Sequence, residues 1–191
     1  VIEDNRSGTP NGITTLENIE IVEFSDLDKT TNELLENFYK ITQSNYAADD
    51  LNIIDASTSI IINASAIISL TGLASDILNA YESSGINGLG NEKLTISDIS
   101  IDASLLNILD LNTTGIINAS TITNITGSSS EINNAISSEG ISNLENKKIT
   151  IFDSSIDASL LNTINEKTTG IINLIALTSL TGSASDIFNA Y

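Results

Sequence analysis

The 191-residue chain contains no cysteine and no histidine. Their absence excludes a disulfide framework, thiolate catalysis and the zinc sites that these two residues build. Tryptophan and methionine are absent as well, even at position 1, and proline occurs once. We therefore expect the chain to be a segment of a longer polypeptide or the product of processing.

Basic residues are also scarce: 7 Lys and Arg stand against 25 Asp and Glu, which gives a formal net charge of −18. Such a surface repels the phosphates of nucleic acids and anionic lipid headgroups, so we expect neither as a partner. No apolar run reaches the roughly 18 residues of a membrane span, and no signal peptide is visible, so we expect no membrane insertion. The acidic surface does tolerate divalent cations.

A repeat organises most of the sequence. The dipeptide Thr-Gly begins at Thr71, Thr126 and Thr181, at a constant step of 55 positions (126 − 71 and 181 − 126), which we call the repeat step. An ungapped alignment of residues 92–136 with residues 147–191 gives 26 identities in 45 positions. Self-similarity in one register over such a length indicates tandem repeats. We divide the chain into an N-terminal segment and three copies, of which the third is truncated: 1–36, 37–91, 92–146 and 147–191.

Each copy alternates strand and helix patterns. In copy two, Leu94–Ile96 and Ile116–Asn118 read as short strands, and Ser100–Asp102 reads as the opening of a helix. Short parallel strands that alternate with helices pack as an α/β layer structure. Apolar residues make up 40% of the chain and aromatic residues 4%, which suits a thin layered core. The predicted fold is an α/β solenoid of 55-residue repeats with an N-terminal strand and helix cap.

Capping signals mark the second helix of each copy. Ser128 and Glu131 match a capping box, and Ser183 and Asp186 repeat it. Copy one has Leu73 at this position, so we expect Thr71 to cap its helix instead. In the N-terminal segment, Ile19 and Ile21 alternate with acidic residues and predict an edge strand, and residues 27–40 predict a helix that caps the array.

Two aspartate pairs are the candidates for a metal site. Asp98 and Asp102 recur as Asp153 and Asp157. Paired carboxylates supply the oxygen ligands that calcium prefers. Aspartate is equally suited to turns and helix N-caps, which is the interpretation that we favour. Copy one lacks the pair, so it is not part of the basic repeat.

Asparagine and threonine also recur at the repeat step. The asparagines fall into three registers: Asn52, Asn107 and Asn162; Asn63, Asn118 and Asn173; and Asn79, Asn134 and Asn189. They form either a ligand-binding array or, as we favour, a ladder of amides that bond the backbone of the adjacent coil. The Thr-Thr pairs that begin at Thr113 and Thr168 form either a flat face for ordered water or sugar, or simple turns, which we favour.

The first 26 residues resemble a known bacterial segment. The pattern Asn11-Gly12, Thr15-Leu16, Asn18-Ile19-Glu20 and Phe24-Ser25-Asp26 resembles the stretch that trails hemolysin-type (RTX) calcium-binding repeats. The glycine–aspartate nonapeptides that bind calcium in that family are absent from this chain. The resemblance therefore implies a secreted setting and assigns no calcium ligand here.

The repeats resemble a second group of proteins. The pattern DASLLN, TTGIINAST, LTGSASDI and NAY is similar to tandem repeats of giant secreted or cell-surface proteins of marine bacteria, notably cyanobacteria. That resemblance implies a secreted or cell-surface location and assigns no mechanism.

We favour a non-catalytic structural and interaction segment of a large extracellular or cell-surface bacterial protein, of the adhesin or hemolysin type. The alternative is a calcium- or glycan-binding module. Adjacent repeats of the same polypeptide are the expected partners, with a cell-surface or glycan partner beside them. No nucleophile, phosphate-loop or dinucleotide motif is present, so we do not expect an enzyme.

Overall fold

The computed structural model describes residues 13–16, 19–22 and 40–191. Near the start, β1 (Ile13–Leu16) and β2 (Ile19–Val22) pair antiparallel. The strand predicted around Ile19 and Ile21 is confirmed as β2, whereas β1 has no counterpart among the predictions. The helical cap predicted over residues 27–40 lies outside the described residues, except for its last position.

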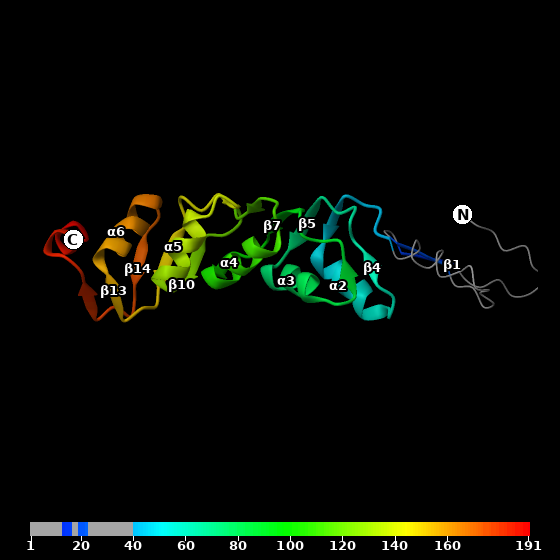
Figure 1. Ribbon diagram of the computed structural model, residues 1–191, viewed down its shortest axis with the longest axis horizontal. Coiled ribbons are helices and arrows are strands. Elements are labelled where there is room, and N and C mark those ends of the chain that lie inside the picture. Colours follow the sequence, from blue (N-terminus) through cyan, green and yellow to red (C-terminus); the bar gives the residue numbers. More distant parts are fainter. Residues whose placement is uncertain (1–12, 17–18, 23–39) are drawn as a thin grey trace, which may run out of the picture.

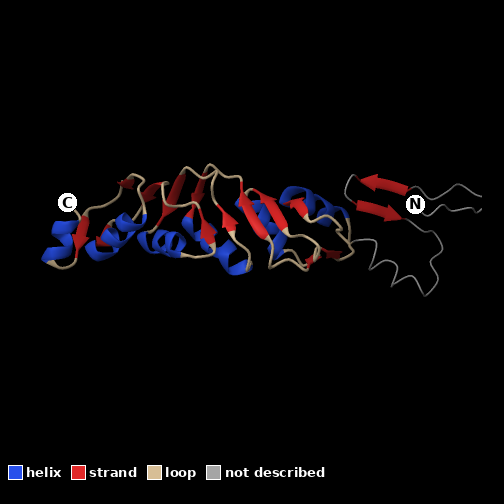
Figure 2. Ribbon diagram, turned by 90° about the horizontal axis from the view of Figure 1, so that it is seen from above, coloured by secondary structure: helices blue, strands red, loops and turns tan. Residues whose placement is uncertain are grey.

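Helices follow one another along the remainder of the described chain, each packed against the next. They are α2 (Ala48–Ser57), α3 (Ala74–Glu82), α4 (Ala103–Asn112), α5 (Ser129–Ser137), α6 (Ala158–Lys167) and α7 (Ala184–Asn189). Figures 1 and 2 show that residues 40–191 form an elongated body along which the helices follow one another in a row. Within the described ranges, no helix combines the length and apolar character that crossing a bilayer requires.

Short strands flank these helices. The strands that lead into a helix are β3 (Asn45–Ala47), β5 (Ser69–Gly72), β8 (Ser100–Asp102), β10 (Asn124–Gly127), β13 (Ser155–Asp157) and β15 (Ser179–Thr181). The strands that follow a helix are β4 (Ile62–Asn63), β6 (Ile86–Asn87), β9 (Ile117–Asn118), β11 (Ile141–Ser142) and β14 (Ile172–Leu174). Two additional strands, β7 (Lys93–Ile96) and β12 (Lys148–Ile151), lie between a strand that follows one helix and a strand that leads into the next.

All pairings from β3 onward are parallel, and the additional strands connect two kinds of neighbour. β7 pairs with β5, which leads into α3, and with β9, which follows α4. β12 likewise pairs with β10 and β14. The resulting sheets have the strand orders β11-β9-β7-β5-β3 and β14-β12-β10-β8, with shorter sheets β13-β15 and β4-β6. Alternating parallel strands and helices confirm the α/β class of the prediction.

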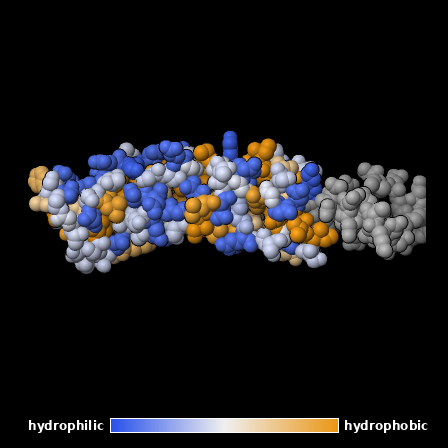
Figure 3. All heavy atoms as spheres, viewed as in Figure 1, coloured by the Kyte–Doolittle hydropathy of each residue, from blue (hydrophilic) through white to orange (hydrophobic). Residues whose placement is uncertain are grey.

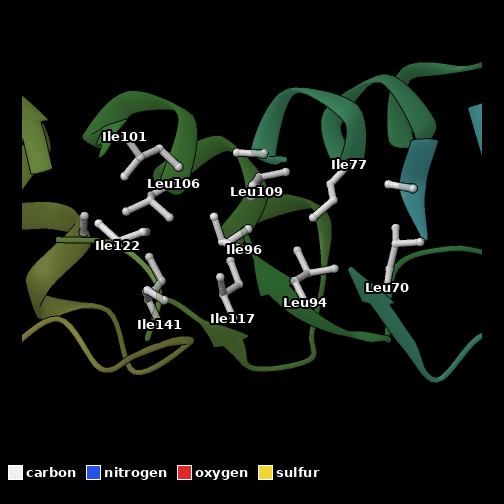
Figure 4. Close-up of a cluster of buried hydrophobic side chains, with 14 of the residues drawn as sticks. Leu70, Ile77, Leu94, Ile96, Ile101, Leu106, Leu109, Ile117, Ile122 and Ile141 are labelled. Carbon is white, nitrogen blue, oxygen red and sulfur yellow. The ribbon is translucent and has the colours of Figure 1, made fainter. Parts of the chain in front are cut away.

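The core is a thin layer between strands and helices. Leu70, Leu94 and Ile117 occupy one register across β5, β7 and β9, and each is completely buried. Helix α4 adds Leu106 and Leu109, which are also completely buried. Figure 4 shows these side chains in one continuous cluster. Burying a side chain of this size stabilises the fold by about 1.5–3 kcal/mol, so contacts between successive strands and helices contribute much of the stability.

The local predictions are mostly correct. β7 and β9 confirm the predicted strands, and Ser128 and Glu131 form the complete capping box at the start of α5. The segment Ser100–Asp102, predicted to open a helix, is instead strand β8, and Asp102 is the N-cap of α4. The error has a physical reason: β8 is extended because it pairs with β10, a strand that lies beyond α4 in the chain, as at Ser100↔Asn124.

Candidate functional site

Asp102 and Asp157 cap their own helices. The Asp102 carboxylate accepts a hydrogen bond from the Ser104 backbone N–H at 2.8 Å, and Asp157 accepts one from Ser159 N–H at 2.9 Å. The Ser159 hydroxyl also donates to Asp157. This hydroxyl, followed by the backbone N–H groups, lowers the pKa of Asp157. Both carboxylates therefore serve the free N–H groups of a first helical turn.

Asp98 and Asp153 cap the preceding helix. The Asp98 carboxylate accepts a hydrogen bond from the Ala74 N–H of α3 at 2.7 Å, and Asp153 accepts one from the Ser129 N–H of α5 at 2.6 Å. The prediction that Thr71 caps α3 is wrong. The N-cap residue makes no side-chain cap, and the Thr71 hydroxyl donates to the Tyr46 carbonyl instead.

Each aspartate pair is thus divided between two helices. A cation site needs several oxygen ligands that converge on one point. Among the residues that the structure describes, no three His, Cys, Asp or Glu side chains group in a way that could hold a metal ion. The hydrogen bonds favour the cap interpretation of Asp98, Asp102, Asp153 and Asp157, and a calcium role for them stays a prediction.

The asparagine ladder is confirmed in its first register. The side-chain amides of Asn52, Asn107 and Asn162 donate to backbone carbonyls 24 residues further on, at 2.9, 3.0 and 3.0 Å. Each bond joins one helix to the first turn of the next. In the second register, Asn63 and Asn118 accept a hydrogen bond from the backbone N–H two residues later. The third register does not belong to the ladder, because its side chains lie exposed on helices: Asn79, Asn134 and Asn189.

In each threonine pair the first residue is buried and the second is exposed. Thr113 is buried, and its hydroxyl donates to the Glu92 carbonyl at 2.7 Å. Thr168 is buried as well and donates to the Glu145 carbonyl at 3.2 Å. The following Gly115 leaves no space for a side chain, because a Cβ atom there would lie 2.3 Å from the Glu92 carbonyl oxygen. Thr113 and Thr168 therefore cannot belong to an exposed ligand face, whereas Thr114 and Thr169 are exposed, and a ligand for them stays a prediction.

A buried carboxylate beside β7 is absent from the sequence predictions. Glu92 is completely buried. Its carboxylate accepts hydrogen bonds from the Tyr81 hydroxyl, the Gly90 N–H at 2.9 Å and the Asn91 N–H at 3.1 Å. These bonds offset the large cost of removing a charge from water. Burial, followed by the hydrogen bond and the charge of Glu92, raises the pKa of Tyr81 above its usual range.

A buried cation occupies the equivalent place beside β12. Lys147 lies one repeat step after Glu92 (147 − 92). It is 8% exposed, and its ammonium donates to the Ser120 carbonyl at 3.0 Å. Ile136 takes the position of Tyr81, again one repeat step on (136 − 81). We call the two places the β7 junction (residues 81–98) and the β12 junction (residues 136–153). In the sequence, the two junctions are recognised by a paired difference: Tyr81 and Glu92 in the first correspond to Ile136 and Lys147 in the second.

Serine hydroxyls at the C-caps of α3 and α5 link these helices to the preceding ones. Ser83 donates to the Asp55 carboxylate at 2.6 Å, and Ser138 donates to Asp110 at 2.7 Å. Both serines also accept a backbone N–H from a glycine two residues later. Asp55 and Asp110 are therefore structural carboxylates that join neighbouring units.

The described part of the chain has surface hollows in at least two places. Two of them, of about 330 and 390 Å³, adjoin α6 and α7 and share Asn162, Asn165 and Asn189. A third, of about 370 Å³, lies beside the β12 junction around Asn146 and Lys147. The linings are rich in amides, and the face in Figure 3 mixes hydrophilic and hydrophobic residues along the array. Two of the hollows are lined by polar residues throughout, whereas the hollow of about 390 Å³ also borders apolar and aromatic residues: Leu161, Ile172, Leu174, Ala190 and Tyr191.

Apart from the exposed asparagines of the third register, the recurrent polar side chains discussed above thus bond backbone groups or one another. Within these ranges every buried side-chain nitrogen and oxygen has a hydrogen-bond partner. Comparison of the chain with protein-family models, curated proteins and solved structures finds no match.

Proposed function

We propose that the chain is a non-catalytic structural and interaction segment of a large extracellular or cell-surface bacterial protein, built as an α/β solenoid of 55-residue tandem repeats. The observation that carries this proposal is the use of recurrent polar side chains. Asn52, Asn107 and Asn162 bond the next helix, and Asp98 and Asp153 bond the preceding one. Side chains that serve a neighbouring unit contribute to stacking, on which the stability of a repeat array depends.

The proposed period is supported by elements that recur at the repeat step. Helices α2, α4 and α6 begin at Ala48, Ala103 and Ala158, each one repeat step after the previous one (103 − 48 and 158 − 103). Helices α3 and α5 begin at Ala74 and Ser129, which are separated by the same step (129 − 74). One repeat then comprises two strand–helix–strand units and one additional strand.

The proposed setting follows from charge and resemblance. A net charge of −18 disfavours nucleic acid and anionic membranes as partners. The resemblances to hemolysin-type trailing segments and to repeats of giant bacterial surface proteins support a secreted or cell-surface location. Adjacent repeats are the partners within the chain, and the exposed faces are available to a cell-surface or glycan partner.

Small-angle X-ray scattering tests the solenoid. The chain is compared with a variant in which residues 92–146 are duplicated in tandem. This copy contributes β7, β9 and β11 to one sheet, and β8 and β10 to another. At about 4.8 Å per strand, we expect the maximum dimension to grow by about 10–15 Å while the cross-section stays unchanged. An increase in the cross-section in place of the maximum dimension contradicts the proposal. The control is a variant in which the same 55 residues are inserted in shuffled order.

Thermal unfolding in calcium and in chelator tests the alternative of a calcium module. We expect the same midpoint in both solutions, since the four candidate aspartates are occupied by helix caps. A higher midpoint in calcium favours the calcium module if it disappears in a variant carrying both Asp98→Asn and Asp153→Asn. A rise that survives these substitutions places the calcium elsewhere in the chain.

A further inference from the structure

Two stacked turns border the hollow of about 370 Å³ beside the β12 junction. One turn follows β9 and the other connects β11 to β12, and these strands are neighbours, with Ile117 opposite Ile141 (Figure 4). A further turn stacks on the second one, since the hydroxyls of Thr168 and Thr169 both donate to the Glu145 carbonyl. The hollow therefore lies within the array and not at its last unit. Five residues of the first two turns line it: Ser120, Asn143, Glu145, Asn146 and Lys147.

Lys147 brings a buried charge to this hollow. The residue is 8% exposed, and its ammonium donates one hydrogen bond, at 3.0 Å, to the Ser120 carbonyl. An ammonium has three donors, and no other group of the described residues bonds or ion-pairs with this one. Burial of a charge is costly unless the charge is paired. Two donors therefore remain for the acceptor groups of a ligand.

The equivalent place beside the β7 junction is closely packed. One repeat step before Asn143 stands Gly88, where a Cβ atom would lie 2.8 Å from the Ser65 backbone nitrogen. Asn143 carries a Cβ atom at this place, with φ of 68°, so the two turns must stand further apart there. Glu92, in the place of Lys147, already accepts hydrogen bonds from a hydroxyl and two backbone N–H groups. The hollow and its free donors thus arise where copy two departs from copy one.

The other lining groups suit a ligand with several hydroxyls. Asn146 is exposed and has no partner among the described residues. Ser120 and Glu145 are exposed as well, and they add a hydroxyl and a carboxylate. Amides, hydroxyls and carboxylates bond the hydroxyl groups of a sugar. An apolar ligand would instead need walls that this lining does not offer.

We propose that this hollow binds a sugar residue that carries a carboxylate, as in an acidic polysaccharide. The sugar carboxylate accepts the two free donors of Lys147, and the ring hydroxyls bond Asn146 and Glu145. A hydrogen bond between two charged groups is about twice as strong as one between neutral groups, so the ammonium distinguishes an acidic sugar from a neutral one. The Glu145 carboxylate repels a second negative charge, which disfavours phosphate esters. This inference deepens the proposed function and rests on it, because it names the class of glycan that the segment binds.

An NMR titration of the whole 191-residue chain tests the proposal with three probes: glucuronate, glucose and acetate. We expect glucuronate to shift the amide resonances of residues 120 and 143–147 in a saturable manner. Glucose has the ring without the carboxylate, and acetate has the carboxylate without the ring. Each should bind at least about tenfold more weakly, because each lacks one of the two groups that the hollow recognises.

Three variants locate the binding in this hollow. Lys147→Gln keeps a donor but removes the charge, so it should weaken glucuronate binding by about tenfold or more and hardly affect glucose. Asn146→Ala changes an exposed side chain and should weaken both sugars several-fold without loss of the fold. Lys148→Gln is the matched control, since it changes the net charge equally at the neighbouring exposed position and should leave binding unchanged.

The inference is wrong if glucuronate causes no saturable shift, or if the Lys147→Gln and Asn146→Ala variants bind it as tightly as the unchanged chain. Equal binding of acetate also overturns it, since the site then holds an adventitious ion only, and equal binding of glucose shows that the carboxylate is not recognised. Scattering from the duplicated variant separates these failures from that of the proposed function. A duplicated variant that elongates while glucuronate does not bind overturns only the inference about the hollow.

Discussion

The β7 and β12 junctions share their backbone but not their buried polar group. In both, the additional strand takes the same register, and an aspartate caps the preceding helix. The β7 junction buries Glu92, with Tyr81 and two backbone N–H groups as donors. The β12 junction buries Lys147, which donates to a backbone carbonyl of Ser120.

The difference teaches which parts of a junction are interchangeable. The strand register and the helix caps are the same whether the buried side chain is glutamate or lysine. The buried charge must instead match its surroundings, because a carboxylate needs donors and an ammonium needs acceptors. Where Tyr81 is replaced by Ile136, the hydroxyl donor is missing, and the charged residue changes sign with it.

The largest loss of stability is expected from Glu92→Lys. This substitution places the buried lysine of the β12 junction in the β7 junction, where the neighbouring groups are hydrogen-bond donors. The ammonium cannot accept from the Gly90 and Asn91 N–H groups and lies buried next to the Tyr81 hydroxyl. We expect the free energy of unfolding to fall by about 3–5 kcal/mol, measured by urea denaturation.

Lys93→Glu is the matched control, since it changes charge at the neighbouring exposed position and should cost within about 0.5 kcal/mol. The double variant Tyr81→Ile with Glu92→Lys should recover part of the loss. A loss below about 1 kcal/mol for Glu92→Lys alone would show that the junctions do not depend on the sign of the buried charge.

Tyr81→Phe is the next largest change and removes one donor from Glu92. We expect a loss of about 1.5–3 kcal/mol, the usual range for a hydrogen bond to a charged group. The pKa of Tyr81 is raised in the folded state from an ordinary value of 10.0. Its contribution is therefore fully present below about pH 10 and declines as the pH rises further, because the unfolded state ionises first.

The variant should accordingly lose less stability than the wild type between neutral and strongly alkaline pH, as followed by urea denaturation at each pH. Tyr46, whose pKa is also raised by burial, is present in both chains and cancels in the comparison. Equal alkaline losses in the two chains would contradict a half-buried Tyr81 phenol that donates to Glu92.

Removal of a cap has a smaller expected effect. Asp98→Ala and Asp153→Ala each leave a helix N-terminus without its acceptor, at α3 and α5 respectively. We expect about 1 kcal/mol from each in urea denaturation. The effect at α5 should be smaller, because Ser128 still caps that helix whereas Leu73 makes no side-chain cap at α3. Equal losses at the two junctions would contradict this division of roles.

Apart from the asparagine ladder, which recurrence at the repeat step made visible, the features that the sequence predicted correctly have partners that lie close in the chain. The capping box of Ser128 and Glu131 spans three residues, and Asp102 bonds the N–H two residues later. Such signals are legible because the chain itself brings the groups together. The α/β class followed similarly, from strand and helix patterns that alternate along the sequence.

What the sequence did not reveal depends on contacts between units. Strand β8 is only three residues long and is extended because β10 lies beside it. Asp98 caps a helix that begins 24 residues earlier. Residues close to the start of that helix do not indicate this contact, so Thr71 was the predicted cap. The Tyr81–Glu92 contact is visible in the sequence only when residues 81 and 92 are compared with residues 136 and 147, one repeat step later. Both residues of the pair differ there, to Ile136 and Lys147, which indicates that the two side chains depend on each other.

The smallest expected effect concerns Asp157, a cap at the exposed surface beyond the β12 junction. The Ser159 hydroxyl and N–H lower its pKa from the ordinary value of 3.8. A carboxylate with a lowered folded pKa contributes stability above its unfolded pKa and loses it as the pH falls through the folded pKa, so the contribution fades below about pH 4.

Asp157→Asn keeps an N-cap acceptor but removes the charge, so the acid limb of the unfolding curve should become slightly flatter while stability at neutral pH hardly changes. Ser159→Ala sharpens the test, because loss of the hydroxyl should raise the carboxyl pKa in an NMR titration, and an unchanged pKa would show that the hydroxyl is not its main cause.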